Sequence, residues 1–189
     1  MRCFVAALFD DPTRERLERL LALVRSGDAP VRWVRAEGLH ATLAFLGELS
    51  EVQAQAAARA LHDAVGRQAA IPVHVGDVGG FPSSRAARVV WVGVREPTGR
   101  LADVQASLVQ RLRAAGLTLD DAERFHPHVT LGRAREGKVS AERCASRLSK
   151  VDVTPAPGYV CSVVLFQSDL GPGGARYTPL EAVHLGGTP

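Results

Sequence analysis

Two copies of one short histidine pattern stand out in the sequence. Residues 40–43 read His-Ala-Thr-Leu and residues 128–131 read His-Val-Thr-Leu, so both copies share His-x-Thr-Leu. With 6 histidines in the chain, composition alone predicts only about 0.03 copies of such a tetrapeptide. The repetition therefore indicates two related sites.

The two histidines suit acid/base chemistry on a phosphate ester. Phosphodiester cleavage needs a neutral imidazole to accept a proton, a charged imidazole to donate one, and hydrogen-bond donors for the phosphoryl oxygens. Histidine, with an ordinary pKa of ~6.5, can fill either role at neutral pH. His40 and His128 are the candidate pair, with the hydroxyls of Thr42 and Thr130 as donors. A single His-x-Thr is better explained as a structural strand residue, and only the doubled pattern favours catalysis.

Both copies fall on predicted strands, where successive side chains point to opposite faces. The histidine and the threonine of each copy thus share one face. We expect the intervening side chains to point into a core, namely Ala41, Leu43 and Phe45 in the first copy and Val129 and Leu131 in the second. The small Ala44 and Gly132 should leave room for a ligand on the histidine faces.

Around these motifs the chain resembles the two-histidine phosphoesterases, and within them the bacterial RNA 2′,3′-cyclic phosphodiesterases, also called 2′-5′ RNA ligases. The resemblance covers nearly the whole chain and includes RCFVAALF, RWVRAEGLHATLAFLGEL, GGFPSSRAARVVWVGV and LFQSDLGPGGARYTPLEAVHL. It implies a bilobal fold with the motifs on facing central strands and no metal or other cofactor. It also implies hydrolysis of a terminal 2′,3′-cyclic phosphate to a 2′-phosphate.

The resemblance also implies a role for each matching residue. His40 would be the general acid that protonates the departing 3′ oxygen, and His128 the general base that activates water. Thr42 and Thr130 would hold the phosphate, and Arg133, at the end of the second motif, would also contact substrate. Exchanging the two ester oxygens of the substrate exchanges acid and base, so the two roles are interchangeable here.

Other residues near the motifs are candidates for substrate binding. Position 126 is often basic in the family and is His126 here, which we expect to contact substrate phosphate. His126 and His128 have the spacing of some metal sites, but no carboxylate or cysteine converges on them, so we predict no metal. In the predicted Gly-rich loop 79–87, Phe81 could stack on a base and Arg85 or Arg88 could meet a phosphate. An ordinary turn with a buried Phe81 explains that loop equally well.

The elements that must position these residues alternate between strand and helix. We predict one α+β domain over residues 1–189, a bilobal duplicated fold with two antiparallel sheets facing a central cleft and helices packed outside. Trp33 and Trp91 fall in strand patterns and should be core. Predicted strands span 3–8, 31–34, 39–46, 71–78, 89–94, 128–133, 159–166 and 176–183; predicted helices span 12–24, 51–68 (N-cap Ser50), 97–115 and about 141–148.

Composition restricts the class of protein further. A chain of 189 residues with 46% hydrophobic residues can bury a core, and no apolar run approaches the roughly 18 residues of a membrane span. The apolar start, residues 1–9, is too short for a signal peptide. Cys3, Cys144 and Cys161 show no CxxC spacing, so we predict buried cysteines in a cytoplasmic protein. The expected partners are RNA ends or nucleotide 2′,3′-cyclic phosphates, with no membrane, and the chain should be a monomer.

Two alternative functions use the same residues. A ligase would run the reaction backwards and join a 2′,3′-cyclic phosphate end to a 5′-hydroxyl end, although water at high concentration favours hydrolysis. A non-catalytic module would only hold RNA ends or nucleotides through the histidines. Intact histidines in both motifs argue against such a module. The net charge of +3 is weak support for a nucleic-acid partner.

Overall fold

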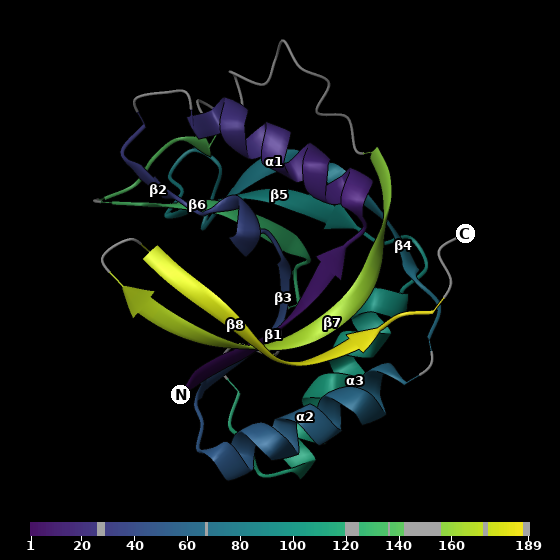
Figure 1. Ribbon diagram of the computed structural model, residues 1–189. Coiled ribbons are helices and arrows are strands. Elements are labelled where there is room, and N and C mark those ends of the chain that lie inside the picture. Colours follow the sequence, from purple (N-terminus) through teal and green to yellow (C-terminus); the bar gives the residue numbers. More distant parts are fainter. Residues whose placement is uncertain are drawn as a thin grey trace.

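The computed structural model describes residues 1–25, 29–66, 68–119, 125–135, 137–141, 156–171 and 174–186. The predicted helix near 141–148 lies outside these ranges except for residue 141. Cys144 lies wholly outside them. The described elements are β1 (Arg2–Phe9), α1 (Asp11–Arg25), β2 (Val31–Trp33), the 3-10 helix η1 (Ala36–Gly38), β3 (Ala41–Glu48), α2 (Glu51–Val65), β4 (Ile71–Phe81), β5 (Val89–Arg95), α3 (Arg100–Ala114), β6 (His128–Ala134), β7 (Ala156–Gly171) and β8 (Gly174–His184) (Figure 1).

The strands form one antiparallel sheet in the order β1-β3-β6-β5-β4-β7-β8, with β2 on β6. Strand β1 also pairs with β7, so six strands form a closed ring from which β2 and β8 project. The predicted α+β class is confirmed. The structure has one continuous sheet where two were expected. The long β7 joins the two halves, because it pairs with β4 through residues 156–160 and with β1 and β8 through its later residues.

In the part of the chain that the structure describes, three α-helices cover this sheet from two sides. Helix α1 packs against β7, where Thr13 lies close to Gly158, and α2 and α3 lie side by side at the opposite end of the molecule (Figure 1). The predicted N-cap of α2 is confirmed: Ser50 Oγ accepts from the Gln53 amide and the Gln53 side chain accepts from the Ser50 amide. No helix in the described ranges is both long and apolar enough to cross a membrane.

Strand β4 extends through the two glycines that the sequence placed in a loop. A Cβ on Gly79 would come within 2.3 Å of the Trp91 ring, and one on Gly80 would come within 2.4 Å of Ala87 Cβ. The glycines therefore serve close packing inside a sheet, and the loop begins only after Phe81. This difference brings Phe81 onto the same sheet as the second motif.

Candidate active site

The two histidine motifs meet at a single point of the sheet. Strands β3 and β6 share one register pair, Ala41 opposite Val129, and both residues are fully buried. Antiparallel register around this pair places His40 opposite Thr130 and Thr42 opposite His128. Because neighbouring side chains alternate, all four polar side chains lie on the face away from Ala41 and Val129. We call this the histidine face.

Each motif also carries a β-bulge at its leucine. The β1–β3 register passes from Val5 opposite Ala44 directly to Ala6 opposite Thr42, leaving Leu43 without a partner. A bulge turns two successive residues toward the same side. Leu43 and Ala44 are accordingly both buried.

The same irregularity occurs in the second motif. The β5–β6 register passes from Val90 opposite Gly132 to Trp91 opposite Thr130, which leaves Leu131 without a partner. Leu131 and Gly132 are both buried. The duplication thus extends to the detailed backbone geometry of the two strands.

The bulges overturn three expectations from simple alternation. Ala44 belongs to the core and leaves no room for a ligand. Gly132 makes room for β2 instead, since a Cβ there would lie 2.5 Å from Val31 Cγ1 and 2.8 Å from the Trp33 ring. Phe45, expected in the core, is 46% exposed and opposes Phe4 on the histidine face. At the equivalent place after the second bulge stands the exposed Arg133.

His40 sits among aromatic rings. Its ring centroid lies 4.9 Å from that of Phe4, 5.3 Å from Tyr177 and 6.5 Å from Phe166. The pKa of His40 is lowered to about 4, mainly by burial; a hydrogen bond to the backbone of Gly38 opposes this change, and the charge of His128 contributes to it. His40 is therefore neutral at neutral pH in the free protein.

His128 has a matching environment. Its Nδ1 donates to the carbonyl oxygen of His126 at 2.7 Å, which leaves Nε2 of the neutral ring as a proton acceptor. Its ring centroid lies 5.0 Å from Phe81 and 6.2 Å from Trp91. Burial lowers the pKa of His128, and the charges of His126 and Arg133 add to that effect. Both histidines thus bond the backbone two residues before them.

The structure brings the predicted substrate-binding residues to this region. Thr42 and Thr130 are half-buried on the histidine face. His126 is exposed, with its ring 5.3 Å from Phe81. Arg88 is exposed beside the same strand end, where its amide donates to the Phe81 carbonyl oxygen at 2.7 Å. Across the described ranges, no group of three or more His, Cys, Asp or Glu side chains could hold a metal ion.

Besides Phe4 and Phe166, which lie beside His40, Trp91 and Tyr177 are aromatic residues of the site that were not predicted there. Trp91 was expected in the core but is half-buried on the histidine face, 5.1 Å from the His126 ring. The burial of Val90 and Val92 on either side requires this, so strict alternation along β5 could have found it. Tyr177 stands edge-on to His40; burial raises its phenol pKa, while the charge of Arg133 acts to lower it.

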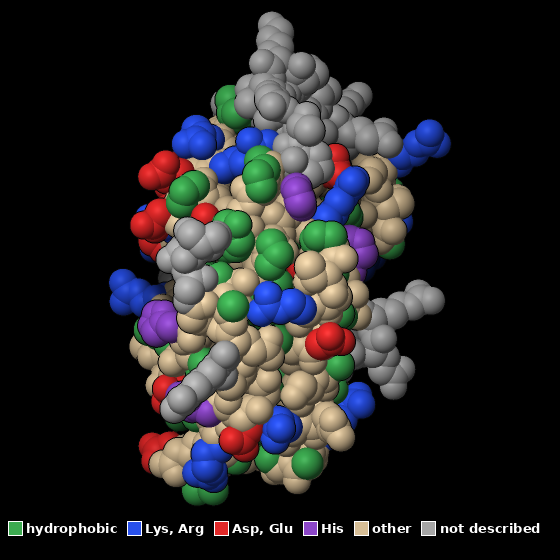
Figure 2. Space-filling model, turned by 90° about the vertical axis from the view of Figure 1, so that its right-hand side faces the viewer, with side chains coloured by type: hydrophobic (Ala, Val, Ile, Leu, Met, Phe, Trp, Pro, Cys, Tyr) green, Lys and Arg blue, Asp and Glu red, His purple; other side chains and the backbone are tan. Residues whose placement is uncertain are grey.

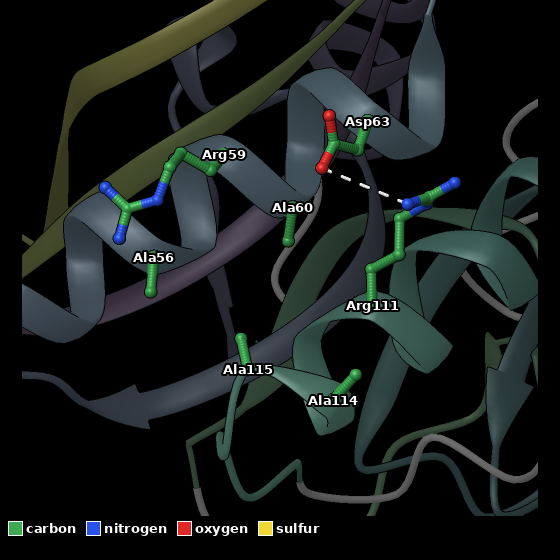
Figure 3. A pocket seen from close by; sticks show the side chains of 7 residues that line it. All are labelled: Ala56, Arg59, Ala60, Asp63, Arg111, Ala114 and Ala115. Carbon is green, nitrogen blue, oxygen red and sulfur yellow. Dashed lines mark ion pairs between the residues drawn. The ribbon is translucent and has the colours of Figure 1, made fainter.

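A groove on the outer side of the molecule is separate from these residues. It has a volume of about 480 Å³ and lies between α2 and α3, with an ion pair of Arg111 and Asp63 at 3.9 Å (Figure 3). Its remaining lining consists of Arg59 and four alanines. No predicted site residue lines it.

The sequence model of the 2′-5′ RNA ligase superfamily matches residues 9–172. The chain belongs to this superfamily. The paired motifs on one sheet face and their shared bulges are therefore features of a superfamily member.

Named relatives and solved structures agree with that membership. An RNA 2′,3′-cyclic phosphodiesterase of Methanothermobacter thermautotrophicus is 30% identical over 98% of this chain and 99% of its own length. One of Escherichia coli is 34% identical over 79% of this chain and 77% of its own. The crystal structure of E. coli LigT complexed with 3′-AMP matches 97% of each chain with a TM-score of 0.75 and 29% identity. TT0787 of Thermus thermophilus matches 98% of each chain with a TM-score of 0.76 and 27% identity.

Proposed function

We propose that this superfamily member hydrolyses RNA terminal 2′,3′-cyclic phosphates to 2′-phosphates, with His40 and His128 as the acid/base pair. The pairing of Ala41 with Val129 carries the proposal, because it sets two imidazoles and two hydroxyls on one sheet face. Relatives that match nearly the whole chain bear the name RNA 2′,3′-cyclic phosphodiesterase, which supports the same activity.

The proposed step is an attack of water on the cyclic phosphorus. His128 accepts a proton through Nε2 as the water oxygen bonds to phosphorus. The bond from phosphorus to the 3′ oxygen breaks, and His40 donates a proton to that oxygen. The products are a 3′-hydroxyl and a 2′-phosphate, so atoms and charge balance without a cofactor.

Protonation of the site must then follow substrate binding. Burial favours the neutral form of both rings in the free protein, which suits the base but not the acid. The cyclic phosphate is an anion, and an anion close to an imidazole raises its pKa. The acid therefore takes up its proton as the substrate enters.

The surrounding side chains have distinct tasks in this proposal. Thr42 and Thr130 donate hydrogen bonds to the non-bridging phosphoryl oxygens, where negative charge is concentrated. Arg133 adds positive charge close to His128. Phe81 and Trp91, with ring centroids 5.2 Å apart, provide aromatic surface on which a terminal base can stack.

The deciding experiment combines activity and product identity. The purified protein is incubated, with EDTA present, with an oligonucleotide that ends in a 2′,3′-cyclic phosphate, and the terminal phosphate of the product is located by NMR. We expect turnover to a 2′-phosphate. A 3′-phosphate product would refute the proposed regiochemistry, and activity that EDTA abolishes and a divalent ion restores would refute the metal-free mechanism.

A further inference from the structure

One polar side chain lies on the apolar stripe of helix α3. The buried residues of α3 include Leu101, Leu108 and Leu112, and Gln105 stands on the same stripe, four positions after Leu101 and three before Leu108. The Gln105 side chain is 6% exposed. A buried carboxamide is stable only where it is hydrogen-bonded. The partner of Gln105 therefore identifies what this residue does.

That partner belongs to the first histidine motif. Gln105 Nε2 donates to the carbonyl oxygen of Leu43 at 3.3 Å. A carbonyl oxygen can only accept, so the nitrogen of the carboxamide faces it. The hydrogen bond joins residues 62 positions apart in sequence. It ties α3 to the strand that follows His40 directly and carries Thr42.

Leu43 is the residue that the bulge in β3 leaves without a register partner. The register of β3 with β1 passes over it, and the register pair of β3 with β6 lies earlier in the strand, at Ala41. Leu43 is buried, and a buried carbonyl group without a hydrogen bond is costly. Gln105 thus supplies a donor at the point where the strand pairing is interrupted.

The second motif has a main-chain counterpart of this contact. Leu131, at the corresponding bulge, is passed over in the β5–β6 register, and its carbonyl oxygen accepts from the Val34 amide at 2.9 Å. Val34 directly follows β2. Each bulge carbonyl therefore has a donor from another part of the chain, a backbone amide in the second motif and a side chain in the first. The shared arrangement indicates a shared role in fixing the bulge.

The position of the bulge decides which side chains reach the histidine face. Before the bulge Thr42 is in register with Ala6, and after it Phe45 is in register with Phe4. A bulge that moved by one residue would turn the side chain between its old and new positions to the opposite face. The ring of His40 packs against that of Phe4. The position of His40 therefore depends on the same register.

Exposed polar side chains are in a different situation from Gln105. On the face that Figure 2 shows, basic and acidic side chains are interspersed over the surface, where water can satisfy them. The loss of one such side chain leaves no buried group unpaired. Gln105 is buried, so its loss would deprive the Leu43 carbonyl of this donor inside the core.

We propose that Gln105 is a positioning residue for the first motif: its carboxamide holds the bulge at Leu43 in place and thereby keeps His40 and Thr42 in position on the histidine face. Gln105 acts through the backbone of β3. The expected effect on catalysis rests on the proposed function, whereas the expected effect on His40 can be measured without substrate.

The test removes the donor without emptying its space. Gln105→Met keeps a side chain of similar length but lacks the carboxamide. Gln105→Asn keeps the carboxamide one methylene short of its partner and serves as the second variant. Ser50→Ala is the matched control, because it removes the N-cap hydrogen bond of α2, the helix beside α3, and touches neither motif. Urea unfolding establishes that each variant is folded and compares their free energies of unfolding.

We expect Gln105→Met to lower kcat about 10- to 100-fold on an oligonucleotide that ends in a 2′,3′-cyclic phosphate, with KM within about twofold, because misplaced catalytic groups slow the reaction of bound substrate. Gln105→Asn should lower kcat in the same way, and Ser50→Ala should change neither constant. A normal kcat in either folded Gln105 variant, or an equal loss in Ser50→Ala, would overturn the inference.

Histidine titration by NMR distinguishes this inference from the proposed function. Burial keeps the pKa of His40 low. A displaced first motif admits water to this ring, so the pKa of His40 should rise toward ~6.5 in Gln105→Met and stay low in Ser50→Ala. His128 should titrate as in the unaltered protein, because the bulge of its own motif keeps the Val34 donor.

The two measurements together separate the possible outcomes. A raised His40 pKa in the Gln105 variants alone supports the positioning role even if no substrate is hydrolysed. Turnover of the cyclic phosphate with His40 pKa and kcat both unchanged in these variants leaves the proposed function standing and rejects the role of Gln105.

Discussion

Ala41 and Val129 face each other as the one register pair between β3 and β6. Neither side chain is exposed, and each is the middle residue of a His-x-Thr sequence. This contact between two apolar residues holds the two imidazoles on a common face. The predictions below follow from that face and from the groups packed around it.

The first prediction concerns the loss of individual groups. His40→Ala and His128→Ala should each lower kcat/KM by about 10²- to 10⁴-fold, the usual scale for one acid/base group. Thr42→Ala and Thr130→Ala should lose less, because they donate hydrogen bonds without exchanging protons. Steady-state kinetics on a cyclic-phosphate oligonucleotide measures all four variants. Near-normal turnover in His40→Ala would refute the paired mechanism.

The second prediction is the pH dependence of kcat/KM, which reports the free enzyme. Activity rises with pH as the base loses its proton and falls as the acid loses its own, so the profile should be a bell. Because burial lowers the pKa of both His40 and His128, the maximum should lie below pH ~6.5, the ordinary histidine value. The maximum of kcat should lie at higher pH, since bound phosphate raises both pKa values.

The same profile assigns the two roles. If His128 is the base, His128→Ala should remove the acidic limb and His40→Ala the alkaline limb. Removal in the opposite order would exchange acid and base but keep the pair. The wild-type limbs belong to the coupled pair and are not assigned by inspection. A wild-type profile with a single limb would contradict the mechanism.

The third prediction concerns stability in acid. The pKa of His40 is about 4 in the folded protein and ~6.5 when unfolded. Below pH ~6.5 the unfolded chain therefore binds a proton that the folded chain rejects, and stability is lost as pH falls toward 4. For a half-buried ring this loss is on the order of 2 kcal/mol.

Urea unfolding of wild type and His40→Gln between pH 7 and 4 tests this prediction. As pH falls from 7 to 4, the free energy of unfolding of the wild type should decrease by about 2 kcal/mol more than that of His40→Gln. The exposed His184 provides a control, since it is not one of the rings that contact His40. A wild-type minus variant difference that stays constant with pH would rule out a depressed His40 pKa.

The fourth prediction concerns the glycine beneath Trp91. Gly79→Ala places a Cβ 2.3 Å from the indole ring, and a rigid ring inside a sheet can avoid it only by shifting. The variant should lose about 1–3 kcal/mol of unfolding free energy. Gly186→Ala is the matched control, because the atom nearest to its added Cβ is 3.8 Å away. Equal free energies of unfolding of the two variants in urea would contradict the prediction, because they would mean that the Trp91 ring shifts at little cost.

The sequence by itself predicted the acid/base chemistry and determined most of the secondary structure. The doubled His-x-Thr-Leu identified the two imidazoles, and alternation put each histidine on the same side as its threonine. These are local properties, since the direction of a side chain on a regular strand depends only on its neighbours in sequence. Ser50 was recognisable as an N-cap for the same reason: its partner, Gln53, lies three residues away.

Only the tertiary structure decided where alternation fails and which distant groups join the histidines. A bulge is a mismatch between two strands, so the burial of Ala44 and the exposure of Phe45 depend on β1 as much as on β3. Tyr177 reaches His40 because β8 pairs with β7, which in turn pairs with β1. Such contacts between residues far apart in the chain arise from strand pairing, which the periodicity of a single strand does not encode.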